Sequence, residues 1–261
     1  MASSPNWLRR YREGRHDQVW AELRELGGAV RRPGLAQEAQ LVCDEMARRA
    51  RRNVEVIVGR LAGQGYRFHA NDDARTPVVP WVPPTARAAQ HAAWLQERFG
   101  PVPMTVLSWV RIVGDVWLVG THPQWPESAS GDPLVIELEG SRYPSGSIGG
   151  YYEEAFQAWH EVARWTGQDP GARPFTLDVA PDRLFKDNTS GGAPYGIIVP
   201  DPCADGQFAG EEGNDPVPFV SYLNDVFAHG GFPYGEYPWL PGPGSSEVQV
   251  KRSLNQDLLP L

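Results

Sequence analysis

The apolar side chains of the first 75 residues recur at the three- and four-residue steps of amphipathic helices. From residue 5 to about residue 26 the apolar positions fit one helix, which the pair Gly27-Gly28 ends. A longer helix follows over about residues 33–61, and arginines occupy its other faces. Two such helices cannot bury both apolar faces alone, so we expect residues 1–75 to form a helical hairpin that packs on a second unit.

Beyond this hairpin the pattern alternates between helical and extended segments. Four prolines in residues 76–85 predict a stiff connector. We expect helices at 85–99, 104–113, 151–166 and 219–229, and strands at 116–120, 133–138, 175–179 and 197–199. The sequence therefore predicts an α+β protein, with a second domain over 86–240 and a tail over 241–261.

The formal net charge of −8 is unevenly distributed along the chain. Residues 1–75 hold 14 Arg against 10 Asp and Glu, a net charge of +4, and the remainder holds 10 Lys and Arg against 22 Asp and Glu, a net charge of −12. Because acids interrupt the arginines of the first segment, a solvated helix surface is favoured over a nucleic-acid patch. The acidic remainder would attract a basic protein partner.

The sequence lacks features that several classes of protein require. No apolar run approaches the roughly 20 residues that span a bilayer, and the first residues lack the apolar stretch of a secretion signal. The two cysteines, Cys43 and Cys203, form neither a disulfide framework nor a metal-binding knuckle. We expect a cytoplasmic protein with no cofactor and no metal.

Two motifs come close to metal sites, and each lacks a required ligand. The segment from Asp201 to Glu212 has the acid and glycine spacing of a calcium loop, but Cys203 stands where an oxygen ligand is needed. His160-Glu161 is typical of a zinc protease helix, but Arg164 occupies the place of the second histidine.

The loop Lys186–Gly196 is the most suggestive segment for ligand chemistry. Its glycines and backbone amides beside a lysine would suit an anion, although the Gly-Lys-Ser/Thr ending of a P-loop is missing. A triad can be drawn from Ser190, a histidine and an aspartate, but no Gly-x-Ser-x-Gly elbow supports it. The histidine would be His122 or His229, and the aspartate Asp132, Asp178 or Asp187. A hydrolase or ligand-binding enzyme that uses the Lys186–Tyr195 loop with His122 is therefore an alternative, and we predict that the protein is not an enzyme.

The helix at 94–99 ends in Gly100-Pro101-Val102-Pro103, and a second helix, Gly114 and a strand follow it. This order resembles the opening of the SUKH superfamily, and the helix from Phe219 to Leu223 is similar to the end of that family. The resemblance covers about residues 86–235. It implies a mostly antiparallel sheet in a binding domain, and a role as an immunity protein that neutralises a toxin by direct binding. It brings no catalytic residues.

The whole chain also resembles a group of bacterial proteins without an assigned activity. The shared segments are Thr121-His122-Pro123, Asp132-Pro133-Leu134-Val135, Lys186-Asp187-Asn188 and Ser190-Gly191-Gly192-Ala193-Pro194-Tyr195. This second resemblance implies no function.

Aromatic residues are unusually frequent in the predicted loops of the second domain. Tryptophan and tyrosine often anchor protein interfaces, so we expect part of this set to line a surface groove. The residues that we expect to contact a protein partner are Trp117, His122, Trp125, Asp187, Asn188, Tyr195 and Tyr234. The leading prediction is a protein-binding module of the immunity or antitoxin type with a basic partner. A DNA-associated regulator that uses the arginines of residues 48–60 is the second alternative.

Overall fold

The computed structural model describes residues 5–142, 147–166, 174–189, 191–211, 213–234 and 246–261. Its α-helices are α1 (Trp7–Arg12), α2 (His16–Leu26), α3 (Ala36–Gly63), α4 (Ala88–Phe99), α5 (Met104–Ser108), α6 (Ser147–Thr166), α7 (Arg183–Lys186), α8 (Phe219–Ala228) and α9 (Ser246–Asn255). Shorter helical turns are η1 (Gly27–Arg31), η2 (Trp109–Val113) and η3 (Ser128–Gly131). The predicted α+β class, with a helical N-terminal region, is confirmed.

The strands form three small sheets whose pairings are antiparallel. The first pairs β1 (Arg67–Phe68) with β4 (Gly120–Thr121), and the second has the order β2 (Trp81–Val82), β3 (Asp115–Trp117) and β5 (Val135–Ile136). The third has the order β6 (Phe175–Ala180), β7 (Tyr195–Val199), β8 (Gln207–Ala209) and β9 (Val217–Pro218). One backbone bond of 2.9 Å, from Glu137 to Val179, links the second sheet to the third.

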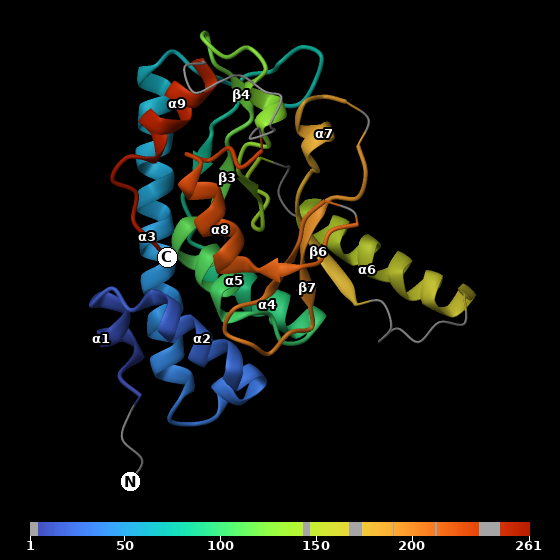
Figure 1. The fold of residues 1–261 in the computed structure, drawn as a ribbon. Coiled ribbons are helices and arrows are strands. Elements are labelled where there is room, and N and C mark those ends of the chain that lie inside the picture. The colour runs from blue at the N-terminus through green and yellow to red at the C-terminus, as the bar shows by residue number, and fades with distance from the viewer. Residues whose placement is uncertain (1–4, 143–146, 167–173, 190, 212, 235–245) are drawn as a thin grey trace.

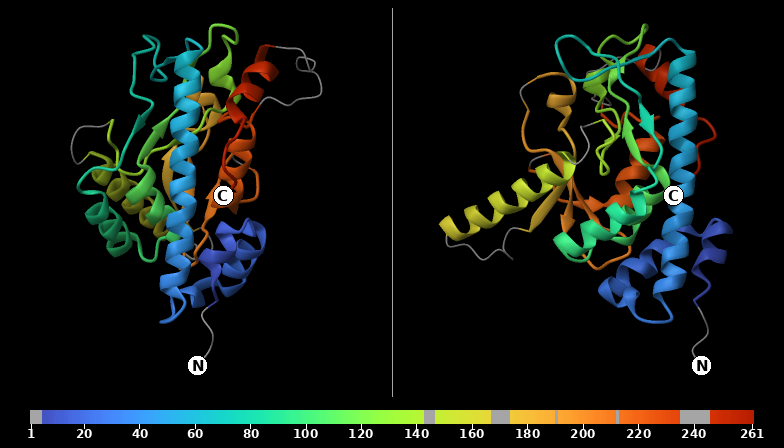
Figure 2. Two further views of the ribbon diagram at one scale, coloured as in Figure 1. Left: turned by 90° about the vertical axis from the view of Figure 1, so that its left-hand side faces the viewer. Right: turned by 180° about the vertical axis from the view of Figure 1, so that it is seen from behind.

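The 28-residue helix α3 runs along one side of the molecule (Figures 1 and 2). Its buried positions recur every three or four residues, among them Val42, Met46, Ala50, Val54 and Ile57. Helices α1 and α2 lie at one end of α3, and α9 lies at the other end. The apolar stripe predicted from the sequence therefore faces neighbours from both ends of the chain.

The first predicted helix is two helices, α1 and α2, and the prediction of a single helix is wrong. Gly14 lies between them with φ of 88°, a left-handed conformation that glycine adopts without steric cost. The bend at Gly14 lets both Tyr11 and Trp20 reach the interior, where their rings meet edge to face.

The connector predicted at 76–85 is tied to both halves of the chain. Trp81 belongs to β2, and its indole nitrogen donates to the carbonyl of Val113 at 2.8 Å. The guanidinium of Arg51 on α3 lies 5.2 Å from the centroid of the same ring. The buried apolar side chains form one cluster from Trp7 to Leu261. The predicted domain boundary stays a prediction, because a continuous core neither requires nor excludes it.

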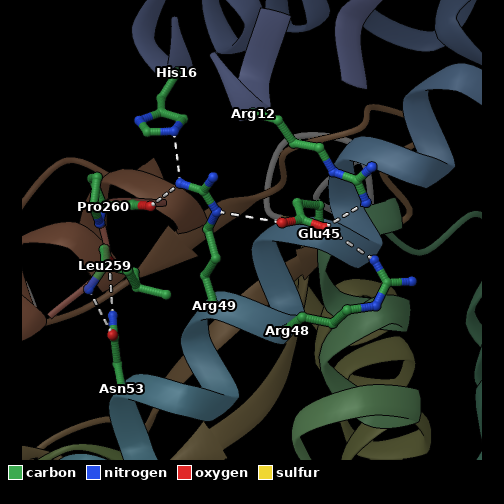
Figure 3. A network of polar contacts seen from close by, with 8 residues as sticks. All are labelled: Arg12, His16, Glu45, Arg48, Arg49, Asn53, Leu259 and Pro260. Carbon is green, nitrogen blue, oxygen red and sulfur yellow. Dashed lines mark hydrogen bonds and ion pairs between the residues drawn. The ribbon is translucent and has the colours of Figure 1, made fainter. Parts of the chain in front are cut away.

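The predicted tail is partly described, and its last residues lie against α3 and α8. The side chain of Asn53 on α3 donates to the carbonyl of Leu259 and accepts from its amide, both at 2.8 Å (Figure 3). Asn224 on α8 donates to the carbonyl of Leu261 at 3.3 Å and accepts from its amide at 2.9 Å. Arg49 donates to the carbonyl of Pro260 at 3.1 Å. This segment is thus held through its main chain.

Among the described helices, none combines the length and apolar character that a bilayer-crossing segment requires.

Candidate functional site

A cavity of about 580 Å³ opens between α6, α7 and the end of β6. Figure 1 shows α6 and α7 on the same side of the molecule, next to β6. Carboxylates of Glu137, Asp178 and Asp182 line the cavity beside the guanidinium of Arg142. Most of the remaining wall is apolar, with side chains of Ile148, Val179, Pro181, Phe185 and Pro194. A few polar groups that converge in an apolar pocket of this size are typical of a binding site.

Glu137 and Arg142 form a bidentate salt bridge in the cavity wall. Nε and Nη2 of Arg142 donate to the two carboxylate oxygens of Glu137 at 2.5 and 2.7 Å. The guanidinium carbon lies 3.5 Å from the centroid of the Trp117 ring, so the ring covers one face of the cation. Burial raises the pKa of Glu137, and the bonds from Arg142 oppose that rise. The charge of Glu137 is therefore matched within the chain.

The buried carboxylate of Asp115 fixes the loop that carries Arg142. Its oxygens accept hydrogen bonds from the backbone amides of Leu138, Glu139 and Ser141 at 2.9, 3.0 and 2.7 Å. These three amides follow β5 directly, so they have one common acceptor instead of a neighbouring strand. These bonds satisfy the backbone donors of the loop and position it where it enters the cavity wall.

Asp178 is a partly buried carboxylate in the middle of β6. The hydroxyl of Tyr151 on α6 donates to its Oδ2 at 2.5 Å. Burial raises the pKa of Asp178, and the bond from Tyr151 opposes that rise. In the described ranges no basic side chain pairs with Asp178. Among the described contacts, its carboxylate thus has no counter-charge and, unlike that of Asp182, no backbone amides as donors.

Asp182 organises the turn on the opposite wall. It is the N-cap of α7, where its Oδ1 accepts the amide of Phe185 at 2.7 Å, and its Oδ2 accepts the amide of Gly192. A Cβ atom at Gly191 would stand 2.4 Å from both carboxylate oxygens, so only glycine allows this close approach. Asn71 donates to the carbonyl of Phe185 at 2.9 Å. Asp182 has a structural role, because both of its oxygens hold backbone.

A second charged cluster lies behind α7, away from the cavity surface. Nζ of Lys186 pairs with Oδ1 of Asp132 at 2.6 Å, and the lysine is 1% exposed. The hydroxyl of Tyr195 lies 3.4 Å from Oδ2 of Asp132, and the ammonium lies 4.7 Å from the centroid of the same ring. Burial raises the pKa of Tyr195. Lys186 thus neutralises a buried carboxylate and is not available to an anion.

Four of the residues predicted to contact a partner are buried. Trp117 donates its indole hydrogen to the carbonyl of His69 at 2.9 Å, Trp125 packs on Phe232, and Tyr195 belongs to the cluster with Asp132. His122 is 1% exposed, with Nε2 at 3.1 Å from Oε1 of Gln64. Trp117 is the only one of the four that lines the cavity. The other three are core residues, because their rings fill the space between helices and strands, and they offer no accessible surface.

The remaining three predicted residues lie nearer the surface, outside the cavity lining. Asp187 and Asn188 are exposed just after α7, and Asn188 donates to Oδ1 of Asp73 at 2.6 Å. Tyr234 is partly buried, and the guanidinium of Arg183 lies 3.9 Å from the centroid of its ring. The seven residues therefore do not form one continuous face, and a contact between a partner and any of them stays a prediction.

The structure does not bring the Lys186–Tyr195 loop and His122, the two parts of the first alternative, into one pocket. Gly192 and Pro194 of that loop line the cavity, but His122 does not, and burial lowers the pKa of His122. Ser190 lies outside the described residues. Within the described ranges, no three His, Cys, Asp or Glu side chains converge as a metal site requires.

The arginines proposed for DNA contacts are mostly engaged inside the molecule. Arg48 and Arg49 approach the carboxylate of Glu45 at 3.3 and 3.6 Å, and Arg12 approaches it at 3.0 Å (Figure 3). Arg60 donates to the carbonyl of Leu254 at 2.9 Å. Arg48 and Arg52 are nevertheless exposed, so a contact of these arginines with DNA stays a prediction.

Sequence reasoning missed Glu137 and Arg142 as functional residues and treated Asp178 only as a possible triad member. The available signal was a single charge inside an apolar strand, as in Leu134–Leu138 and Phe175–Ala180. In β6 the burial alternates, so Asp178 points to the opposite face from Leu177 and Val179. That α6 covers this face could not be read from the strand itself.

No family model, no curated protein and no solved structure matches the chain. The SUKH resemblance is therefore still a prediction from the sequence.

Proposed function

We propose that this chain is a binding protein, and that a protein partner covers the cavity together with the exposed apolar side chains of α6 and α7. The observation that carries the proposal is where the exposed apolar residues lie. Five of the eight large hydrophobic side chains exposed in the described ranges belong to these two helices. The five are Tyr151, Val162, Trp165, Leu184 and Phe185. Tyr151 and Phe185 of this set also line the cavity, and exposed apolar side chains beside a cavity mark a site of association.

The shape of α6 supports the same proposal. Its first turns pack beside β6, and the rest of the helix extends away from the body of the molecule (Figures 1 and 2). Trp165, near its end, is 95% exposed. A large apolar side chain at such a position gains more from contact with another surface than from contact with water.

Charge supports a basic partner. Residues 76–261 carry a net −12, and the cavity lining holds three carboxylates against one guanidinium. Such a surface speeds the association of a positively charged protein and disfavours acidic ones. Neutralisation of a toxin by direct binding in the cytoplasm is the form of this function that the SUKH resemblance suggests.

The test is to purify the proteins encoded beside this one and to measure their binding by isothermal titration calorimetry. For a true partner, the substitutions Leu184→Asp and Phe185→Asp should each weaken binding at least tenfold, because each removes apolar contact and places a carboxylate where binding would strip it of water.

The matched control is Val217→Asp, which makes the same type of change on β9, the strand farthest from β6 in the same sheet. It should leave the affinity unchanged. A partner that binds both α7 variants as tightly as it binds the wild type would show that the interface lies elsewhere.

A further inference from the structure

We propose that the cavity receives the guanidinium group of an arginine side chain from the protein partner, with Asp178 as its counter-ion. This inference rests on the proposed function, and it names the group that the site recognises.

Asp178 differs from the other two carboxylates of the cavity. Glu137 is paired with Arg142 through two bonds, and both oxygens of Asp182 hold backbone amides. The described contacts of Asp178 include one hydrogen bond, from the neutral hydroxyl of Tyr151, and no cation. A partly buried carboxylate without a counter-charge weakens the folded protein, and a cation from outside would remove that penalty.

The cavity adds a second and independent observation, which is room for a ligand next to this carboxylate. About 580 Å³ of space adjoins Asp178, and two other residues of its lining, Tyr151 and Phe185, are 47% and 54% exposed. The space exceeds the volume of one side chain, so flanking residues of the partner would enter with the arginine.

The walls favour arginine over lysine. The guanidinium ion is planar and weakly hydrated, so it pairs with carboxylates through two parallel bonds and stacks on flat apolar groups. Pro181, Pro194 and Phe185 supply such groups around Asp178. One guanidinium in the cavity wall already has such contacts. Arg142 forms a bidentate salt bridge with Glu137, and the Trp117 ring stacks on it. Lysine would lose more hydration in this setting.

The electrostatic balance of the lining permits a second cation. With all groups ionised, Glu137, Asp178 and Asp182 against Arg142 leave a net charge of −2. The charge of Arg142 is matched by Glu137, so its repulsion of an incoming arginine is reduced.

The test uses three blocked amino acids that mimic side chains of a protein, namely the Nα-acetyl amides of arginine, lysine and citrulline. Wild-type protein should bind the arginine compound in the millimolar range, the lysine compound several-fold more weakly and the neutral citrulline compound undetectably. In nuclear magnetic resonance spectra, the backbone signals that shift should be those of Asp178, Tyr151 and Phe185.

Asp178→Asn is the decisive variant, because it removes the charge and keeps both the size and the bond to Tyr151. It should lose at least tenfold in affinity for the arginine compound. Glu161→Gln, the same change at an exposed position of α6, should bind like the wild type. A thermal unfolding curve shows whether each variant is folded, and the mapping on the wild type decides the question if Asp178→Asn is not.

Four results would overturn the inference, namely equal binding of arginine and citrulline compounds, tighter binding of lysine, shifted signals outside the cavity, or full affinity in Asp178→Asn. If free L-arginine bound more tightly than its blocked amide, the ligand of the cavity would be the free amino acid and not an arginine side chain of a partner. The proposed function is tested separately, since Leu184→Asp and Phe185→Asp can weaken a partner even where no arginine compound binds.

Discussion

At the scale of single residues, the backbone amides of Leu138, Glu139 and Ser141 share one buried acceptor in Asp115. Asp115→Ala leaves these donors without a partner, and we expect it to lower the free energy of unfolding by about 2–4 kcal/mol. Urea unfolding measures this change. The exposed Asp215→Ala should change stability by less than about 0.5 kcal/mol, and equal effects of the two substitutions would contradict the role of Asp115.

The pair Lys186–Asp132 gives a second prediction at this scale. Lys186→Met removes the cation and leaves a buried carboxylate, so we expect a loss of about 3–5 kcal/mol in unfolding free energy. The double variant with Asp132→Asn should be more stable than Lys186→Met alone, since no unpaired charge remains. Asn suits position 132 because φ there is 56°. Simple additivity in the double-mutant cycle would show that the two groups do not interact.

The role of these single residues was hard to read from the sequence. Lys186 sits in a glycine-rich loop, which suggests an anion site, but its partner Asp132 lies 54 positions away. Likewise His122 and Trp125 occupy loops that the sequence predicts to be exposed, and they are buried because Gln64 and Phe232 pack on them. Loop residues keep their local pattern whether or not a distant segment covers them.

At the scale of elements, helices with a long apolar stripe were predictable and short strands were not. Helix α8 agrees with its predicted range within one residue, and α3 within three residues, because the period of 3.6 repeats several times in each. The predicted strand 116–120 is split between β3 and β4, which belong to different sheets. Two or three residues carry too little alternation to fix a pairing partner.

The C-terminal segment gives the prediction that belongs to this scale. Asn53→Ala removes both bonds to the backbone of Leu259, so we expect a loss of about 1–3 kcal/mol and faster hydrogen exchange of the Leu259 amide. Mass spectrometry after deuterium labelling detects the exchange. Exposed Asn214→Ala is the control. Unchanged exchange at residues 258–261 in Asn53→Ala would mean that the other contacts, including those of Arg49 and Asn224, hold the segment without Asn53.

At the scale of the whole molecule, some arginines of the basic first segment bind carboxylates and carbonyls of the acidic remainder within the fold. The basic first segment and the acidic remainder meet directly, for Arg24 pairs with the buried Asp205 at 2.7 Å. Arg31 donates to the carbonyls of Pro202 and Val102, and Arg60 to that of Leu254. These three arginines of residues 1–75 therefore join the two parts of the chain through ion pairs and bonds to carbonyl oxygens.

The Asp178 carboxylate contributes to the pH dependence of stability in a direction that can be measured. Burial raises the pKa of Asp178 in the folded state. The protonated side chain therefore contributes to the stability of the fold below the unfolded pKa, and this contribution is lost as pH rises through the folded pKa. The titratable groups around it are Glu137, Arg142, Tyr151 and Asp182, and a comparison of Asp178→Asn with the wild type removes their shared effects.

We therefore expect Asp178→Asn to melt higher than the wild type at pH 7, by roughly 2–4 °C, and to lose this advantage as the pH falls through the raised pKa of the folded aspartate. Differential scanning calorimetry from pH 4 to pH 8 measures both. A variant that melts lower at pH 7 would show that the Asp178 carboxylate supports the fold, and a difference that is constant with pH would show that its ionisation is not the cause. A carboxylate that weakens the free protein and strengthens its complex is the behaviour expected of a binding residue, since function is retained there against stability.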